Sequence, residues 1–445
     1  MVGAGQAVAL TDAIILVGIL VITYVGIIHK EFDKVLAASL GGFFAILAGH
    51  FLGIPLVGET PDEGLIRIHD LLILGVILGN LMMVEVATQV GIFQYVSIKL
   101  LKKTKGDPIR LFWLLGALTM VLSAIVNTIS AILVVGALTF VICDELGYDP
   151  WPYILMEIIV TNTGGLTTLI SSPTNLIIGV QFNIGYLAFL KVSLFFGLPM
   201  FFLVMYAFLK LMPIKFELNE EVRLQKIEAF DEWSVVRDRN AFYRTGIAFV
   251  VSMLSFMFSD TLGIELAVLA IGGALLMVLV SGKSLDSMFA KLDWSLLAFL
   301  QGLFVIIASL EEVGVMEAIA GVISGMLGEK TWFAAIVVLW ASAIISGILD
   351  NIVLAAALAP VLRVATQDSS LNGTAIAWAL ILGTNLGGGF TPIGAPPVVL
   401  GLSLYYKKTG RKIGWIEFFK VGGTLTILRL LLSTVLIVIY TLIVT

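Results

Sequence analysis

Charge and cysteine are both scarce in this sequence. Charged residues make up 13% of the 445 residues, about half of the usual share for a soluble protein. The single cysteine, Cys143, excludes an internal disulfide and a thiolate metal cluster. The three histidines are scattered along the chain and form no ligand set. The net charge of −5 comes without a block of basic residues, so nucleic acid is not expected as a partner.

Sequence signatures of catalysis are missing as well. The chain has no phosphate-binding loop, no nucleophile triad and no zinc-ligand spacing. These absences argue against an ATPase or a hydrolase. We therefore expect a protein that is not an enzyme, with no catalytic residues, no metal site and no cofactor.

Apolar residues dominate what is present. They make up 59% of the chain and form repeated windows of about 20 residues, the length that crosses ~30 Å of hydrocarbon. The first window, residues 10–28, lacks the basic start and the small-residue cleavage site of a signal peptide, so we expect a retained span. Residues 71–101 are predicted to form one long, tilted helix. The composition predicts an all-α polytopic membrane protein, with the lipid bilayer as its surroundings.

Two polar, glycine-rich motifs interrupt the apolar sequence. One covers residues 161–175 and the other residues 384–397. Unpaired backbone groups of this kind are too costly against lipid, so they must line an enclosed cavity. Paired interruptions in two halves of a chain indicate the binding site of a transporter. We therefore predict broken helices at 151–185 and 374–404.

Residues 109–143 form an apolar stretch with a polar centre. Its arms of about 14 and 13 residues would each be ~20 Å long, too short to cross the bilayer alone. The length favours a re-entrant helical hairpin that enters and leaves on the same side. An equivalent hairpin is predicted at 332–366.

The second half of the chain repeats the first with a constant shift of 223 residues. The shift relates Ser123 to Ser346, Thr161 to Thr384 and Gly79 to Gly302, which indicates an internal duplication. Each half holds about five transmembrane helices plus the hairpin, an odd number, so the repeats should be inverted in the membrane. The predicted domains are repeat 1 (1–212), a cytoplasmic linker (213–244) and repeat 2 (245–445). Lysine and arginine gather in alternate loops, which places both termini outside the cytoplasmic (inner) membrane.

The two hairpin tips and the two helix breaks should meet near the membrane midplane. Their helix N-termini suit an anion or a polarised oxygen, and carbonyls freed by the breaks suit Na⁺ or a protonated group. The candidate ligands for substrate or ion are the polar side chains of these four segments: Ser123, Asn127, Thr128, Asn162, Thr163, Thr167, Thr168, Asn175, Ser346, Asp350, Asn351, Thr384, Asn385 and Thr391.

Asp350 is the one acid among these candidates, and its counterpart at the shift of 223 is Asn127. An ionisable residue deep in a membrane segment suggests function, here cation binding or proton coupling. Aspartate also caps helices, but the neutral Asn127 can fill that role, so we favour coupling. Arg429 is a further intramembrane charge, expected either to pair with a carboxylate or to extend towards an interface.

The chain resembles the ion transporter superfamily in the hairpin Ser346–Asn351 and in two following motifs, Gly383-Thr384-Asn385-Leu386-Gly387-Gly388 and Thr391-Pro392-Ile393-Gly394. It is most similar to the branch of ArsB-type arsenite permeases and the melanosomal P protein. NhaD sodium/proton antiporters and divalent anion:sodium symporters are more distant. The resemblance covers nearly the whole chain except the linker.

The resemblance implies a secondary active transporter of elevator type and a homodimer formed by the early spans. Proton or Na⁺ coupling is expected, with Na⁺ as a candidate coupling ion. In the sodium-coupled carboxylate members, Ser-Asn-Thr triplets bind substrate and Na⁺. Here the matching positions are altered, as in Leu349-Asp350-Asn351. The order of expected functions is therefore arsenite (or antimonite) efflux, then Na⁺/H⁺ antiport, then sodium-coupled di- or tricarboxylate transport.

Overall fold

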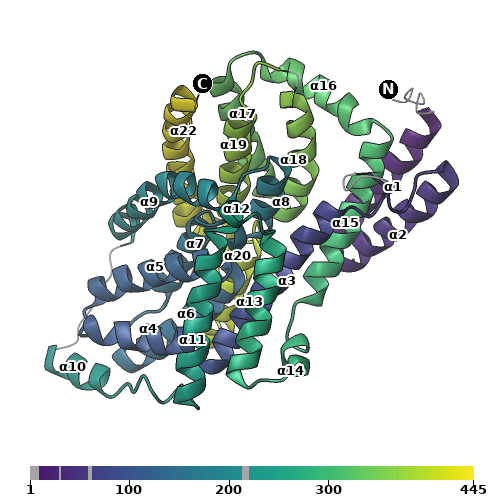
Figure 1. The fold of residues 1–445 in the computed structure, drawn as a ribbon. Coiled ribbons are helices and arrows are strands. Elements are labelled where there is room, and N and C mark those ends of the chain that lie inside the picture. Colours follow the sequence, from purple (N-terminus) through teal and green to yellow (C-terminus); the bar gives the residue numbers. More distant parts are fainter. Residues whose placement is uncertain (1–9, 30–31, 59–62, 213–219, 368, 445) are drawn as a thin grey trace.

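The structure is a computed structural model that describes residues 10–29, 32–58, 63–212, 220–367 and 369–444. These residues form helices joined by short loops, and no strand occurs among them (Figure 1). Eight of the helices are long and apolar enough to cross a membrane. The predicted all-α polytopic class is confirmed.

The first half of the chain contains nine α-helices and a short 3₁₀ turn. In chain order they are α1 (Leu10–Ile28), α2 (Lys34–Leu52), α3 (Ile68–Val90), α4 (Ile92–Lys103), α5 (Pro108–Ile125), α6 (Thr128–Leu146), α7 (Trp151–Gly164), η1 (Leu169–Ser171), α8 (Pro173–Gln181) and α9 (Tyr186–Leu211).

The second half follows a short helix, α10 (Glu220–Glu228), which lies within the predicted linker. Its helices are α11 (Arg239–Phe256), α12 (Ser259–Leu262), α13 (Leu266–Ser281), α14 (Leu285–Phe289), α15 (Trp294–Glu312), α16 (Val315–Leu327), α17 (Thr331–Ser346), α18 (Asn351–Gln367), α19 (Gly373–Gly387), α20 (Pro396–Thr409), α21 (Trp415–Phe418), the π-helical turn η2 (Phe419–Gly423) and α22 (Thr424–Val444). Asp238 caps α11, so the last residues of the predicted linker, 239–244, are helical.

The two helical hairpins enter the molecule from opposite ends. The open end of α5–α6 lies beside α10, where Lys226 donates a hydrogen bond to the Glu145 carbonyl oxygen. The open end of α17–α18 lies beside the C-terminal end of α22, where Asn372 donates to the Val444 carbonyl oxygen. Figure 1 places α10 at the bottom and the C-terminus at the top. This is the inverted arrangement that an odd number of crossings per repeat requires.

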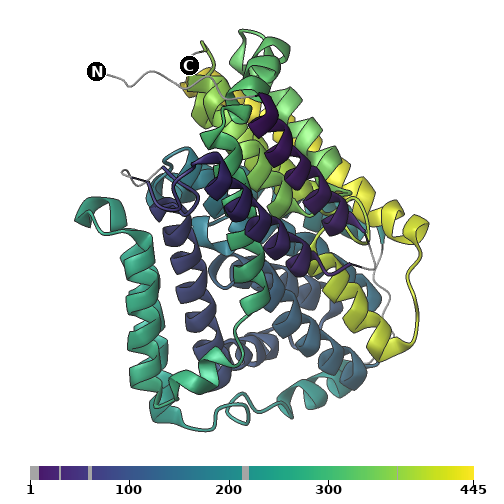
Figure 2. The same cartoon turned by 90° about the vertical axis from the view of Figure 1, so that its right-hand side faces the viewer.

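The early helices of both halves form a common scaffold. In it α2 packs against α1 and α15, while α3 packs against α13; Figure 2 shows α1 and α2 running diagonally across the front. The two main crossings are equivalent under the 223-residue shift. A Cβ at Gly79 would overlap the Ala270 backbone, and one at Gly302 would overlap the Ala38 backbone. Glycine at both positions therefore allows the helix backbones to touch.

The predicted single helix at 71–101 is wrong. Helix α3 ends at Val90, and Gly91 has a left-handed backbone (φ 88°) before α4 starts in a new direction. Gly314 repeats this break between α15 and α16 (φ 72°). The cause is the freedom of glycine to adopt positive φ, which ends a helix.

The predicted hairpin arms were too short. The arms α5 and α6 have 18 and 19 residues, about 27 Å each, because Ser123 continues α5 and Thr128 starts α6 despite their polar side chains. Arm length alone therefore does not identify the hairpin. Its tip does, because Asn127 and Thr128 line an internal cavity.

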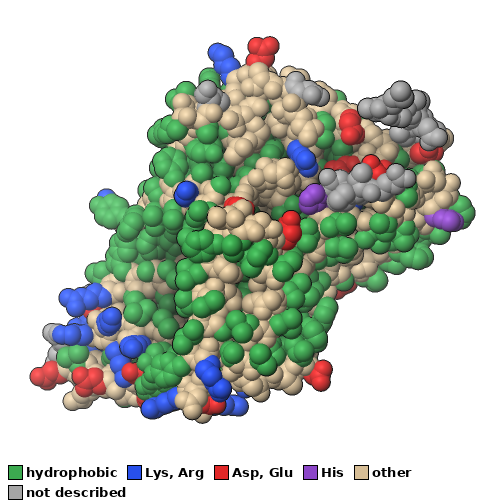
Figure 3. All heavy atoms as spheres, in the orientation of Figure 1, with side chains coloured by type: hydrophobic (Ala, Val, Ile, Leu, Met, Phe, Trp, Pro, Cys, Tyr) green, Lys and Arg blue, Asp and Glu red, His purple; other side chains and the backbone are tan. Residues whose placement is uncertain are grey.

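The outer surface is mostly apolar between its charged ends. Figure 3 shows lysine and arginine side chains gathered at the lower left, over α4 and α10. Lys102 of α4 forms an ion pair there with Glu232, which holds the segment after α10 against the first repeat. The broad apolar belt is what a lipid-facing protein surface requires.

Candidate functional site

The four broken segments and the scaffold enclose one polar cavity of about 520 Å³. The scaffold contributes α3, α15 and the start of α2. The polar residues that line the cavity are Lys34, Asn80, Glu85, Thr88, Asn127, Thr128, Ser130, Asn162, Ser171, Ser172, Lys291, Asp293, Ser295, Asn351 and Asn385. The cavity is large enough for a small organic or inorganic solute.

Four helices begin at the wall of this cavity. Their first residues are Thr128 of α6, Pro173 of α8, Asn351 of α18 and Pro396 of α20, and all four line it. Each helix N-terminus carries roughly half a positive charge. The lining lysines, Lys34 and Lys291, are balanced by Glu85 and Asp293. The helix termini therefore leave the cavity with a positive electrostatic potential.

The two hairpin tips cap their outgoing helices in equivalent ways. The Asn127 side-chain oxygen accepts a hydrogen bond from the backbone N–H of Ser130 (2.7 Å). The Asp350 carboxylate accepts one from the backbone N–H of Ile352 (3.0 Å). Asp350 therefore has the capping role weighed in the sequence, and it also carries a charge that Asn127 lacks.

Four of the predicted ligand hydroxyls attach the hairpins to the broken helices instead of lining the cavity. Ser123 donates to the Thr161 carbonyl oxygen (2.7 Å), and Ser346 to that of Thr384 (2.6 Å). Thr168 donates to the Ala124 carbonyl oxygen (2.5 Å), and Thr391 to that of Gly347 (2.6 Å). Both pairs of bonds are related by the shift of 223 residues. Each hairpin and its broken helix thus form one rigid unit.

Three further predicted threonines bond within their own segments. Thr167 donates to the Gly164 carbonyl oxygen (2.5 Å) and Thr384 to that of Leu380 (2.7 Å). Thr163 accepts a hydrogen bond from Arg429 (3.2 Å). Of the fourteen candidates, those that line the cavity are Asn127, Thr128, Asn162, Asn351 and Asn385.

Asn175 connects the two breaks from behind the cavity. Its side-chain amide donates to the carbonyl oxygens of Gly165 (2.7 Å) and Thr168 (2.9 Å). Its side-chain oxygen accepts from Asn385 of the other repeat (2.9 Å). Asn175 thereby satisfies backbone groups that the glycine break leaves free.

Three amide atoms at the cavity wall have no hydrogen-bond partner among the described residues. They are Nδ2 of Asn162, Oδ1 of Asn80 and Oδ1 of Asn351. Buried polar atoms without partners are costly, so these atoms are available to a bound solute. Asn162 offers a donor, while Asn80 and Asn351 offer acceptors.

Asn80 and Lys34 are the important residues that the sequence reasoning missed. Asn80 of scaffold helix α3 donates to the carbonyl oxygens of Val126 at the first tip (3.0 Å) and Ile170 at the first break (3.1 Å). Lys34 at the start of α2 forms an ion pair with Asp350 at the second tip (2.8 Å). We call these two contacts the tethers, because each holds one hairpin tip to the scaffold. An amide inside the apolar window 71–101 was the available signal for Asn80.

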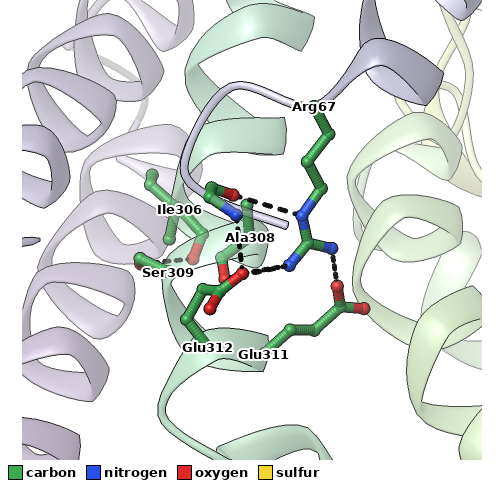
Figure 4. Close-up of polar contacts among 7 residues, drawn as sticks. Arg67, Ile306, Ala308, Ser309, Glu311 and Glu312 are labelled. Atoms are coloured by element: carbon green, nitrogen blue, oxygen red, sulfur yellow. Dashed lines mark hydrogen bonds and ion pairs between the residues drawn. The ribbon is translucent and has the colours of Figure 1, made fainter. Parts of the chain in front are cut away.

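Ion pairs also close the two ends of the scaffold. Lys291, just before α15, pairs with Glu85 near the end of α3 (3.0 Å) at the cavity. At the other end Arg67, just before α3, pairs with Glu311 and Glu312 at the end of α15. Figure 4 shows the Arg67 guanidinium between the two carboxylates, with Glu312 also accepting from the Gly64 backbone N–H (2.8 Å). The two ends are thus fixed by equivalent contacts.

Inverted repeats whose broken helices meet at one polar cavity define a secondary transporter. A family model described as "Citrate transporter" (CitMHS) matches residues 19–383. The chain belongs to this family, within the ion transporter superfamily that its motifs resemble.

Relatives of known sequence support this membership. The chain is 27% identical to the uncharacterized transporter Rv2684 of Mycobacterium tuberculosis over 427 residues, which cover 95% of this chain and 97% of that protein. It is 26% identical to the P protein of Mus musculus over 491 residues, which cover 91% of this chain and 58% of the P protein.

A solved structure shares the fold. The crystal structure of the YdaH transporter of Alcanivorax borkumensis, described as having an unusual topology, superimposes with a TM-score of 0.61 over 98% of both chains. The two sequences are 15% identical, so this likeness concerns the fold alone.

Proposed function

We propose that this protein is a secondary active transporter whose substrate is a small multivalent anion, with di- and tricarboxylates as the first class. The four helix N-termini around a cavity whose side-chain charges cancel carry this proposal. Such termini stabilise negative charge without the cost of burying a lysine. The unpartnered Asn162 amide adds a donor for a carboxylate oxygen.

This proposal changes the order of substrates that the resemblance implied. Arsenite is a neutral trihydroxide near pH 7 and gains little from the positive ends of helices. The family description names citrate, and nothing in the comparisons favours arsenite. We therefore place the citrate-like substrate first and arsenite last.

A Na⁺/H⁺ antiporter is the second candidate, and one observation favours it. The unpartnered acceptor oxygens of Asn80 and Asn351 lie at the same cavity and suit a cation, for which Na⁺ is the candidate. In a coupled anion transporter the same oxygens would hold the coupling ion beside the substrate.

We assign proton coupling to Asp350 and an elevator movement to the two hairpin units. The Asp350 carboxylate pairs with scaffold residue Lys34, so protonation of Asp350 would weaken one of the two tethers. The hairpin units would then move as rigid bodies against the scaffold. A homodimer formed through the scaffold, a cytoplasmic-membrane location and termini on the outside complete the proposal.

Solid-supported-membrane currents from proteoliposomes test the substrate class. Purified protein is challenged in turn with citrate, succinate, arsenite and Na⁺ across a pH series. We expect currents with citrate or succinate and none with arsenite. Currents with Na⁺ or pH steps alone would indicate the antiporter, and an arsenite current would reject the anion proposal. Protein-free liposomes serve as the control.

A further inference from the structure

Arg429 is fully buried in the middle of α22. Its Nη1 donates to the Ile159 carbonyl oxygen (3.0 Å) and to the Thr163 hydroxyl (3.2 Å). Its Nη2 donates to the Thr426 hydroxyl (2.8 Å). Its Nε has no partner among the described residues. The guanidinium therefore neither pairs with a carboxylate nor reaches an interface, the two outcomes expected from the sequence.

The charge on Arg429 is permanent and uncompensated. Guanidinium groups do not lose their proton in proteins. No described carboxylate forms an ion pair with Arg429. The buried acid on the neighbouring helix α7, Glu157, accepts its hydrogen bond from Thr139 of α6 instead. The counterpart of Arg429 in the first repeat is Tyr206, so only one repeat carries this charge.

The guanidinium lies directly behind the cavity wall, in contact with both breaks. At the first break it bonds Thr163, the residue next to the cavity-lining Asn162. At the second break a Cβ on Gly389 would lie only 2.7 Å from Nη2. A glycine at 389 thus leaves room for the guanidinium beside the segment that follows Asn385.

We infer that Arg429 is a specificity-determining residue that favours substrates of higher negative charge through its electric field, without touching them. This inference rests on the proposed anion transport. A purely structural Arg429 would cross-link α22 to α7 and affect every substrate equally. A field effect instead grows with each charge on the substrate. A unit charge ~12 Å away at an effective dielectric constant of ~20 changes affinity about tenfold per substrate charge.

The test uses three carboxylates that share one carbon skeleton: butyrate, glutarate and tricarballylate, with one, two and three charges at pH 8. Their affinities are measured by calorimetry on the full-length protein in detergent. We expect Arg429→Met to weaken binding by about tenfold for each added charge, and Arg429→Lys to keep the order of the native protein. The exposed Lys412→Met is the matched charge control and should leave all three affinities unchanged.

Thr426→Glu provides a second variant in case Arg429→Met fails to fold. It places a carboxylate against Nη2, which cancels the charge while the guanidinium keeps its contacts to α7, and Thr426→Gln is its neutral control. We expect Thr426→Glu, but not Thr426→Gln, to abolish the preference for higher charge. An equal loss for all three carboxylates, or no loss, overturns the inference. A native protein that binds none of them refutes the proposed function instead.

Discussion

Asn385 donates a hydrogen bond of 2.9 Å to Asn175, a residue 210 positions earlier in the chain and in the opposite repeat. This contact joins the two broken helices directly. Asn162, the counterpart of Asn385, lies 4% exposed at the cavity, and its Nδ2 has no partner. Two asparagines of one motif thus have different tasks: Asn175 supports the frame, and Asn162 faces the solute.

The first prediction separates these tasks by substitution with alanine. Asn175→Ala removes hydrogen bonds from two buried carbonyl groups and from Asn385, so we expect a loss of roughly 2–4 kcal/mol of stability, at ~1–3 kcal/mol for each unsatisfied group. Asn162→Ala removes no protein contact of Nδ2. It should keep the native melting temperature and raise the substrate KM about tenfold, as for one hydrogen bond to a charged group. Thermal melting in detergent and transport assays measure both; equal melting temperatures for the two variants would contradict the assignment.

The second prediction concerns coupling. Asp350→Asn keeps a good helix cap but removes the charge that pairs with Lys34. We expect the variant to fold normally and to lose the pH dependence of transport. Lys34→Gln is the control, because it breaks the same ion pair and leaves the acid in place, so its pH dependence should persist. Currents measured between pH 5.5 and 8.5 give the answer, and unchanged currents in Asp350→Asn would remove Asp350 from the mechanism.

The third prediction concerns the Asn80 tether. Asn80→Leu replaces the amide by the residue found at its counterpart, Leu303, and removes two hydrogen bonds of ~1 kcal/mol each. We expect the population with the tip docked on the scaffold to fall roughly tenfold. A cysteine at the cavity-lining Leu133 reports this population by maleimide labelling, since native Cys143 is buried.

Thr88→Val is the matched control for the Asn80 variant. Thr88 lies on the same helix and lines the same cavity, but its hydroxyl bonds only to Val84 of its own helix (2.8 Å). Its labelling rate should equal that of the native protein. If both variants label alike, Asn80 does not act as a tether.

The fourth prediction concerns the close packing behind the breaks. A Cβ at Gly387 would overlap the Ala343 carbonyl oxygen, and one at its counterpart Gly164 would lie 2.6 Å from that of Met120. We expect Gly387→Ala to lower the melting temperature by several degrees. Gly272→Ala is the control: its Cβ meets no atom within 4 Å, so it should stabilise α13 by about 0.5–1 kcal/mol. A neutral Gly387→Ala would show that the hairpin and the broken helix can separate.

The class and the repeat could be predicted from the sequence because they depend on long patterns. Apolar windows report lipid exposure, and a shift of 223 residues that relates Ser123 to Ser346 and Thr161 to Thr384 reports shared geometry. The equivalent hydrogen bonds of Ser123 and Ser346 are the physical basis of that match. Helix ends were less predictable, since glycine at 91 could either continue a membrane helix or end it.

The cavity lining was only partly predictable, for a different reason. Polar residues at the tips and breaks can either support backbone or face a solute, and the sequence does not separate Asn175 from Asn162. The tethers depend on contacts between distant segments. Lys34 and Asp350 are 316 positions apart, and no local pattern connects them.

The tethers also set the resting position of an empty carrier. Because the two halves share one frame, the opposite-facing state would bring Leu303 and Met257, the residues 223 positions after Asn80 and Lys34, to the tips. Neither side chain can hydrogen-bond a carbonyl or pair with an acid. An unloaded molecule would thus idle on one side of the bilayer, and its return journey would limit turnover.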